Sequence, residues 1–115
     1  MRDDRYRLER IVEIGDQLAR VIEAEGITED SVLSDLKTQW LVTTPLYNIG
    51  EQAYCVSNEL KARHGELPWS GVSGLRHRLV HDYEGTNWRL ICSILFREMP
   101  EFLAGVRRIL DEGDL

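Results

Sequence analysis

Residues 42–60 read VTTPLYNIGEQAYCVSNEL, and the apolar positions in this stretch decide the fold. They recur at intervals of four, three, four, three and four residues, which keeps them on one side of an α-helix. Such a repeat is typical of the buried seam of a helical bundle. The seam positions are Val42, Leu46, Ile49, Ala53, Val56 and Leu60. We therefore predict a helical segment from about Asp30 to Arg63.

Three further segments have the same helical periodicity. The first runs from Asp3 to about Glu25, and a short one begins at Pro68, a residue type that suits the first helical position. The last begins after Gly85 and continues to about Leu110. No segment alternates with the period of a β-strand. The sequence therefore predicts an all-α fold, an antiparallel up-and-down bundle of four to five helices.

Proline and glycine indicate where these helices should be interrupted. Pro45 lies inside the seam, and we expect it to kink or divide the helix, because proline lacks a backbone donor and clashes with the preceding turn. Pro100 should bend or split the last segment in the same way. Gly26 should end the first helix. Gly50 weakens a helix by about 1 kcal/mol relative to alanine, so we expect another helix to approach closely there.

The composition is that of one globular domain over residues 1–115. Hydrophobic residues make up 43% of the chain and charged residues 30%. The charged start, Met-Arg-Asp-Asp-Arg-Tyr-Arg, argues against a secretory signal, and no apolar stretch approaches the roughly 20 residues that span a bilayer. We therefore expect a cytoplasmic protein without membrane contact. Cys55 and Cys92 lie in helical patterns without a CxxC motif, so we expect both to be reduced core thiols.

The formal net charge of −6 works against non-specific binding of nucleic acids, because their phosphate backbone favours clustered lysine and arginine. Any nucleic-acid role must therefore come from a local basic patch. The chain has one candidate, formed by Arg76, His77, Arg78, His81 and Arg89.

The stretch from residue 75 to residue 83 concentrates the polar chemistry of the chain. It holds two of the three histidines, two arginines and a tyrosine. If Leu79 faces the core, His81 lies about 200° away on an ideal helix and points outward. Arg76 and His81 are about 140° apart, so one straight helix does not bring them together. They meet at one ligand if the helix ends near Val80, or if two copies of it meet across a dimer axis.

Three interpretations of this stretch are open. An imidazole that titrates near neutral pH, beside a permanently charged guanidinium, is what metal-free RNA cleavage needs. Alternatively, the stretch is a solvated helix face on which Arg78 and Asp82 form an i, i+4 ion pair. His77 and His81 also have the HxxxH spacing of metal ligands, but two ligands do not make a metal site. The sequence contains none of the common nucleotide-binding or serine-nucleophile motifs.

Trp69 and Trp88 flank the polar stretch. We expect both to be large apolar anchors of the helix ends. The alternative is that one of them stacks on an RNA base.

Several short motifs, in their order along the chain, resemble those of the HepT-like HEPN family, which comprises small helical toxins encoded beside minimal nucleotidyltransferase antitoxins. The resemblance covers roughly residues 41–110 and includes an R-x4-H spacing followed by x-Y. The motifs are Tyr47-Asn48-Ile49-Gly50-Glu51, Leu67-Pro68-Trp69, Gly74-Leu75-Arg76, Arg78-Leu79-Val80-His81-Asp82-Tyr83 and Gly85.

The resemblance implies a homodimeric ribonuclease that needs no metal or other cofactor. Arg76 and His81 would be the catalytic R-x4-H pair, in a cleft shared by two subunits, with His77 and Arg78 as RNA-binding residues. Tyr83 takes the place of the tyrosine that the cognate nucleotidyltransferase antitoxin modifies with AMP. A bulky anion beside the cleft would exclude RNA by its volume and by like charge.

His77 departs from the family pattern, in which the residue after the motif arginine is commonly asparagine or another small polar residue. A second imidazole either assists phosphate binding or alters the cleft enough to weaken cleavage. The alternative function is therefore a non-catalytic dimeric HEPN module, which binds a nucleotidyltransferase partner or a nucleotide.

Overall fold

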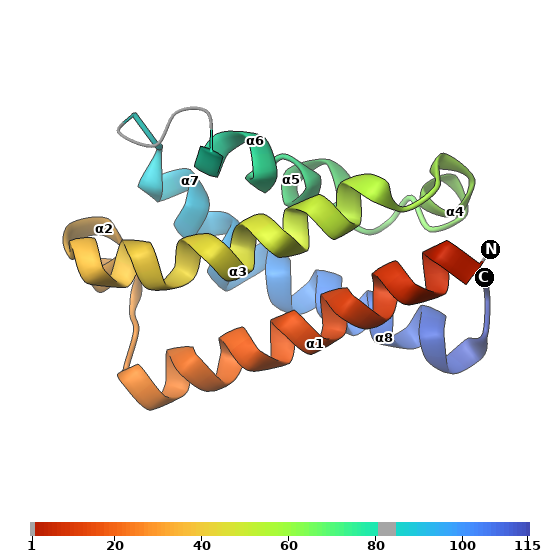
Figure 1. The fold of residues 1–115 in the computed structure, drawn as a ribbon, viewed down its shortest axis with the longest axis horizontal. Coiled ribbons are helices and arrows are strands. Elements are labelled where there is room, and N and C mark those ends of the chain that lie inside the picture. Colours follow the sequence, from red (N-terminus) through yellow and green to blue (C-terminus); the bar gives the residue numbers. More distant parts are fainter. Residues whose placement is uncertain (1, 81–84) are drawn as a thin grey trace.

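A computed structural model describes residues 2–80 and 85–115 of the chain (Figure 1). These residues form helices and no strand, which confirms the all-α prediction. None of their helices is long and apolar enough to cross a membrane. The helices are α1 (Arg2–Glu25), α2 (Glu29–Ser34), α3 (Leu36–Cys55), α4 (Asn58–Arg63), α5 (Trp69–Ser73), α6 (Leu75–Val80), α7 (Trp88–Ser93), the π-helix η1 (Ile94–Glu98) and α8 (Met99–Glu112).

Helix α3 is the centre of the bundle. It packs against α1 on one side and against α5 and α6 on another, while α8 packs against α1. The long segments alternate in direction, and both chain ends lie at the same end of the molecule (Figure 1). All seam positions are buried, including Val56 and Leu60, which lie beyond the end of α3. The predicted seam is thus confirmed as the line along which the other helices pack.

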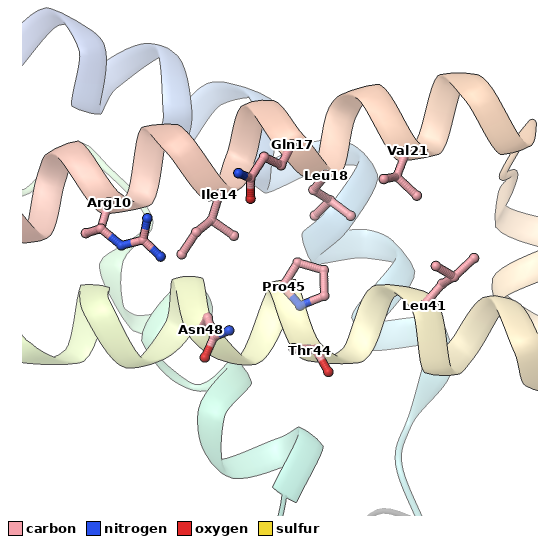
Figure 2. A pocket seen from close by; sticks show the side chains of 9 residues that line it. All are labelled: Arg10, Ile14, Gln17, Leu18, Val21, Leu41, Thr44, Pro45 and Asn48. Carbon is pink, nitrogen blue, oxygen red and sulfur yellow. The ribbon is translucent and has the colours of Figure 1, made fainter.

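Of the two outcomes expected at Pro45, division of the helix is wrong, because α3 continues through this residue. The predicted segment is divided instead at Asp35 and at Ser57, whose side chains cap α3 and α4 by accepting hydrogen bonds from backbone N–H groups three residues later. The Pro45 ring is directed toward α1 (Figure 2). The continuity of α3 shows that the fold tolerates the cost of about 3 kcal/mol for a proline in a helix.

The interruptions expected at Gly26 and Pro100 are confirmed. Gly26 has a φ of 62° and follows α1 directly. Pro100 lies in the first turn of α8, where a missing N–H is tolerated. The preceding turn is the π-helix, in which the Met99 N–H donates to the Ile94 carbonyl five residues back. The last segment is therefore interrupted by a π-helical turn that ends at Glu98, two residues before Pro100.

Trp69 and Trp88, the two tryptophans that flank the polar stretch, both anchor helix ends in the core, as expected. Trp69 is 7% exposed and packs edge-on against Phe102, with ring centroids 5.2 Å apart. Its Nε1 donates a 2.9 Å hydrogen bond to the His64 carbonyl, which satisfies the polar edge of the buried ring. Trp88 is half-buried against the same core.

The two cysteines are both free, but only one is a core thiol. Cys92 is buried, and burial raises the pKa of its thiol. The expectation for Cys55 is wrong, because this residue is exposed at the end of α3. The cause is helical geometry: Cys55 is two positions after the buried Ala53, which places it on the opposite side of the helix.

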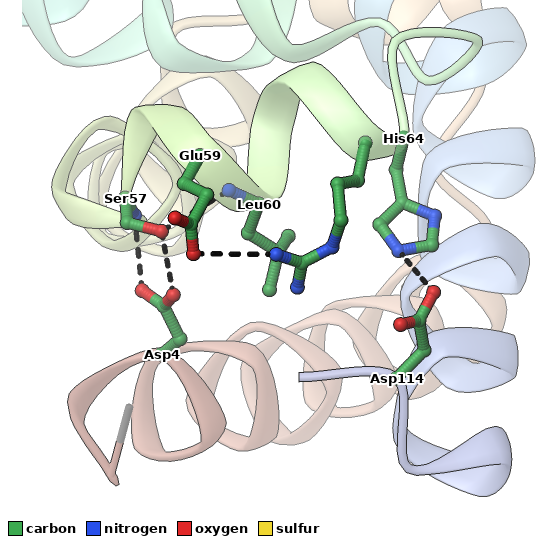
Figure 3. Close-up of polar contacts among 7 residues, drawn as sticks. Asp4, Ser57, Glu59, Leu60, His64 and Asp114 are labelled. Carbon is green, nitrogen blue, oxygen red and sulfur yellow. Dashed lines mark hydrogen bonds and ion pairs between the residues drawn. The ribbon is translucent and has the colours of Figure 1, made fainter.

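Polar contacts close the end of the bundle where the two termini meet (Figure 3). Asp4 is 6% exposed, and its carboxylate accepts hydrogen bonds from the backbone N–H and the hydroxyl of Ser57, at 2.9 and 2.7 Å. The Nε2 atom of His64 lies 3.0 Å from Oδ2 of Asp114. These contacts tie α1 and the C-terminus to the turns at the two ends of α4.

Candidate functional site

The polar stretch from the sequence lies on helix α6 and the residues that follow. Leu75 and Leu79 are buried, as the helical geometry predicted for Leu79, while His77 and Arg78 are exposed. Arg76 is half-buried between these two faces. The remaining predicted site residues, His81 and Tyr83, lie outside the described residues.

Gly50 lets α6 come close to α3. A Cβ atom on Gly50 would lie 2.8 Å from the backbone nitrogen of Arg76, 3.0 Å from the Val72 carbonyl oxygen and 3.1 Å from the Leu75 Cβ. Backbone atoms cannot move aside as the end of a flexible side chain can. The close approach expected at Gly50 is therefore confirmed, and it places Arg76 beside the α3 residue that follows this glycine.

Two side chains of α3 hold the Arg76 guanidinium. Its Nε donates a 2.6 Å hydrogen bond to Oε1 of Glu51, and both side chains are 38% exposed. Its central carbon lies 4.4 Å from the centroid of the Tyr54 ring, which is a cation–π distance. The hydrogen bond that it donates to Glu51 raises the pKa of Arg76. Arg76 is thus a fixed positive charge with a defined orientation.

An open hollow of about 460 Å³ adjoins Arg76 on the side of α5. Burial lowers the pKa of Lys61, whose Nζ donates a 3.1 Å hydrogen bond to the Tyr54 carbonyl. Neither residue was singled out from the sequence, because both lie outside the motifs. The sequence did contain a signal for Tyr54: it is a large aromatic residue that directly follows the seam position Ala53 and therefore lies off the buried seam. The hollow is lined by Tyr54, Lys61, Ser70, Ser73, Arg76 and His77, among others.

A second, smaller hollow of about 240 Å³ lies on the other side of α6. His77 and Arg78 line it together with residues 85–87. The Thr86 hydroxyl donates a 3.4 Å hydrogen bond to the Arg78 carbonyl, which joins the start of the last segment to α6. Both predicted RNA-binding residues therefore line a concave part of the surface.

The hollow between α1 and α3 has a different character. It has a volume of about 320 Å³ and is lined mainly by apolar and uncharged side chains, with Arg10 as its one charged residue (Figure 2). It contains no carboxylate or imidazole that can exchange a proton. The hollows beside α6 are better suited to acid–base or phosphate chemistry, because histidine and arginine side chains line them.

Metal binding has no support in the part of the chain that the structure describes. Within residues 2–80 and 85–115, no three histidine, cysteine, aspartate or glutamate side chains are grouped closely enough to hold an ion. The HxxxH pair considered from the sequence includes His81, which is outside these ranges.

Comparison with known proteins identifies the family. Residues 7–109 match the model of the family described as Ribonuclease HepT-like. The chain belongs to this family. The resemblance inferred from the sequence motifs is therefore confirmed, and the HepT-like match includes α3, α6 and the whole polar stretch at residues 75–83.

Several curated relatives of this HepT-like chain have names that refer to ribonucleases. The chain is 32% identical over 113 residues to "Putative RNase TTE0752" of Caldanaerobacter subterraneus subsp. tengcongensis, which covers 97% of this chain and 98% of that protein. It is 30% identical to "Putative RNase MJ0127" of Methanocaldococcus jannaschii, over 75% of this chain and 71% of that protein. It is 32% identical to "Probable ribonuclease HepT" of Thermococcus cleftensis, over 62% of this chain and 64% of that protein. No solved structure matches the chain significantly.

Proposed function

We propose that this HepT-like protein is a toxin that cleaves RNA without a metal ion, with Arg76 and His81 as its catalytic residues. The observation that carries the proposal is the state of Arg76. It is a permanent cation oriented by Glu51 and Tyr54 at the edge of an open hollow. A preorganised cation of this kind suits the stabilisation of negative charge that builds up on a phosphate during cleavage. Membership of a ribonuclease family supports the same assignment.

The proposed reaction divides acid–base and electrostatic work between two side chains. The His81 imidazole takes the proton from the ribose 2′-hydroxyl, whose oxygen attacks the adjacent phosphorus. The bond from phosphorus to the 5′-oxygen breaks, and that oxygen takes a proton from the imidazolium or from water, which leaves a 2′,3′-cyclic phosphate and a free 5′-hydroxyl. Arg76 stabilises the additional charge on the phosphorane oxygens. The assignment of His81 comes from its R-x4-H spacing after Arg76.

We propose that the active form is a homodimer. On a straight helix Arg76 and His81 diverge by about 140°, so one copy does not direct both at the same phosphate. Two copies of residues 75–83 placed across a two-fold axis would supply the missing group from the partner subunit. His77 and Arg78 would then contact RNA phosphates along the shared cleft, as their exposure and their concave setting allow.

We further propose that a cognate minimal nucleotidyltransferase antitoxin inactivates the protein in the cytoplasm by adding AMP to Tyr83. Tyr83 is seven residues after Arg76, so on a continuous helix the two side chains would lie on the same side. An added phosphate at Tyr83 would compete with the RNA phosphate for the Arg76 cation. It would also repel the RNA phosphate, because both groups are negatively charged. The family resemblance and this spacing support the site.

RNA cleavage in the presence of EDTA tests the central proposal. The wild-type protein should cleave RNA in EDTA, and His81→Ala and Arg76→Ala should each lower the rate by about 100-fold or more. Arg108→Ala, which removes an exposed arginine from α8, is the matched control and should cleave like the wild type. Loss of wild-type cleavage in EDTA would reject the metal-free mechanism. Tight RNA binding without any turnover would favour the non-catalytic module.

Intact-mass measurement tests the modification. Incubation with the nucleotidyltransferase and ATP should add AMP to the wild-type protein and to Tyr6→Phe, which removes the hydroxyl of an exposed tyrosine on α1. Tyr83→Phe should remain unmodified. An AMP adduct that persists in Tyr83→Phe would show that another residue is the acceptor.

A further inference from the structure

We infer that the hollow beside Arg76 is a nucleotide-binding subsite, in which one nucleotide of the RNA strand stacks on Tyr54 and places a phosphate near Lys61. We call it the Tyr54 subsite and define it by Tyr54, Lys61, Ser70 and Ser73, which all line the hollow. This inference rests on the proposed ribonuclease function, because it concerns how the RNA strand is held next to the catalytic arginine.

The aromatic ring of Tyr54 is available to a ligand. Tyr54 is 57% exposed, while the seam residues next to it, Ala53 and Val56, are buried. The Tyr54 ring is therefore not part of the hydrophobic core. Nucleobases stack on aromatic side chains without strong sequence preference, because every base has a π-face. An exposed tyrosine next to the catalytic centre is the kind of platform that single-stranded RNA uses.

Two cations, Arg76 and Lys61, lie near the ring, while the Glu51 carboxylate accepts a hydrogen bond from Arg76. These three groups carry a net positive charge, which favours an anionic ligand. The guanidinium carbon of Arg76 lies 4.4 Å from the ring centroid, and Nζ of Lys61 lies 5.9 Å from it. The chain as a whole has a net charge of −6, so this pairing of cations runs against the general charge of the molecule. A ligand with a flat π-system and a negative charge fits both features, and a nucleotide has both.

The hollow also offers hydroxyl groups and enough room. Oγ of Ser73 is buried and has no hydrogen-bond partner among the described residues, although buried polar atoms are nearly always paired. Ser70 adds a second hydroxyl, on an exposed residue. A volume of about 460 Å³ lies within the range of small-molecule sites. The exposed Ser70 hydroxyl suits the polar edge of a base or the ribose 2′-hydroxyl, and the buried Ser73 Oγ would reach a ligand only after a change of its side-chain rotamer.

RNA binding by the cleavage-deficient His81→Ala protein tests the subsite without turnover. The probe is a short fluorescent single-stranded RNA, and its anisotropy gives Kd. Tyr54→Leu in this background should raise Kd about tenfold, because the base loses its stacking platform. Tyr54→Phe keeps the ring and should bind like the parent. Lys61→Gln should weaken binding and lower the slope of log Kd against log salt concentration by about 0.7, the value for one lost phosphate contact with single-stranded nucleic acid.

Matched controls come from residues of the same type outside the site. Tyr6 is 54% exposed on α1, and Lys37 is exposed on α3. Tyr6→Leu and Lys37→Gln should leave Kd and the salt slope unchanged. If Tyr54→Leu and Lys61→Gln bind as tightly as these controls, the subsite is overturned.

Chemical footprinting gives a test that needs no substitution and so does not depend on the folding of a variant. Lys37 and Lys61 are the only lysines in the chain. RNA should slow the reductive methylation of Lys61 and leave that of Lys37 unchanged, as measured by mass spectrometry. Equal methylation rates with and without bound RNA would contradict the subsite.

The two proposals fail in different ways. If the wild-type protein cleaves RNA while Tyr54→Leu and Lys61→Gln leave RNA affinity unchanged, the ribonuclease assignment stands and the subsite falls. If RNA binding depends on Tyr54 and Lys61 but the wild-type protein never cleaves, the subsite stands and the ribonuclease assignment falls. In a cleaving protein, Lys61→Gln should raise KM more than it lowers kcat, since Lys61 holds the strand and does not touch the reacting phosphate.

Discussion

The Nε atom of Arg76 on α6 donates a 2.6 Å hydrogen bond to Oε1 of Glu51 on α3, a residue 25 positions earlier in the chain. This contact joins the motif arginine to the helix at the centre of the bundle. The hydrogen bond uses one edge of the guanidinium, and the central carbon of the guanidinium lies over the Tyr54 ring. The arginine is thus oriented by α3 before any substrate binds.

Glu51 is therefore expected to be a positioning residue for catalysis. Glu51→Ala should lower kcat about tenfold with a smaller change in KM, because Arg76 is no longer fixed in place. Glu51→Gln keeps an acceptor oxygen for Nε and should recover part of the loss. Glu59→Gln is the matched control, since Glu59 lies on α4 and pairs with Arg63 at 3.3 Å. The measurement is steady-state RNA cleavage.

A double-mutant cycle checks whether Glu51 acts through Arg76. In an Arg76→Ala background, Glu51→Ala should have little further effect on the cleavage rate. Full additivity of the two rate losses would mean that Glu51 has a separate role.

Gly50 should not tolerate a side chain. Gly50→Ala places a Cβ atom 2.8 Å from the Arg76 backbone nitrogen, so α3 and α6 must move apart. We expect a loss of about 1–3 kcal/mol in the free energy of unfolding and a lower cleavage rate. At Gly65 the nearest atom to a new Cβ is 3.8 Å away, so Gly65→Ala is the control and should be close to neutral. Urea denaturation of both variants tests this prediction. Equal denaturation midpoints for Gly50→Ala and Gly65→Ala would contradict the close approach of α3 and α6.

Asp4 is expected to stabilise the end of the bundle and to have no part in catalysis. Asp4→Ala leaves the Ser57 N–H and hydroxyl without the carboxylate that they contact at 2.9 and 2.7 Å (Figure 3). The free energy of unfolding should fall by about 1–3 kcal/mol. Asp3→Ala, at an exposed neighbouring position, should have a smaller effect. Cleavage by folded Asp4→Ala protein should match the wild type, and a loss of activity without unfolding would show that this end of the molecule takes part in function.

The acid stability of the protein should depend on Asp35. Hydrogen bonds from the Thr38 hydroxyl and backbone N–H, at 2.7 and 3.0 Å, lower the pKa of this carboxyl in the folded state. A lowered folded-state pKa means that the stabilising effect is complete above the unfolded-state pKa of about 4. It is then lost as the pH falls through the lower folded-state value.

Asp35→Asn isolates this effect, because asparagine caps a helix but does not titrate in this range. The wild-type free energy of unfolding should fall more steeply than that of Asp35→Asn as the pH is lowered below about 4. Urea denaturation across this pH range gives the two slopes. Parallel curves for the two proteins would show that the Asp35 cap does not contribute to acid stability.

Much of the architecture follows from local sequence. The spacing of Val42, Leu46 and Ile49 predicted a buried seam, and Gly50 predicted a close helix contact. The division expected at Pro45 is wrong, because local rules give the cost of proline in a helix but not the stability that α3 gains from its buried seam. Cys55 was misjudged although the predicted seam was enough to place it, since it lies about 200° from the seam residue Ala53 on the same helix.

The sequence by itself determined the all-α class, the seam and the presence of a polar stretch at residues 75–83, because helical periodicity and motif spacing are local properties of the chain. Only the tertiary structure decided which side chains hold Arg76. Glu51 and Tyr54 come from α3, and Lys61 on α4 lines the same hollow; no regular spacing relates them to a residue on α6. Their meeting depends on the approach of two helices at Gly50, which is fixed by packing over the whole bundle.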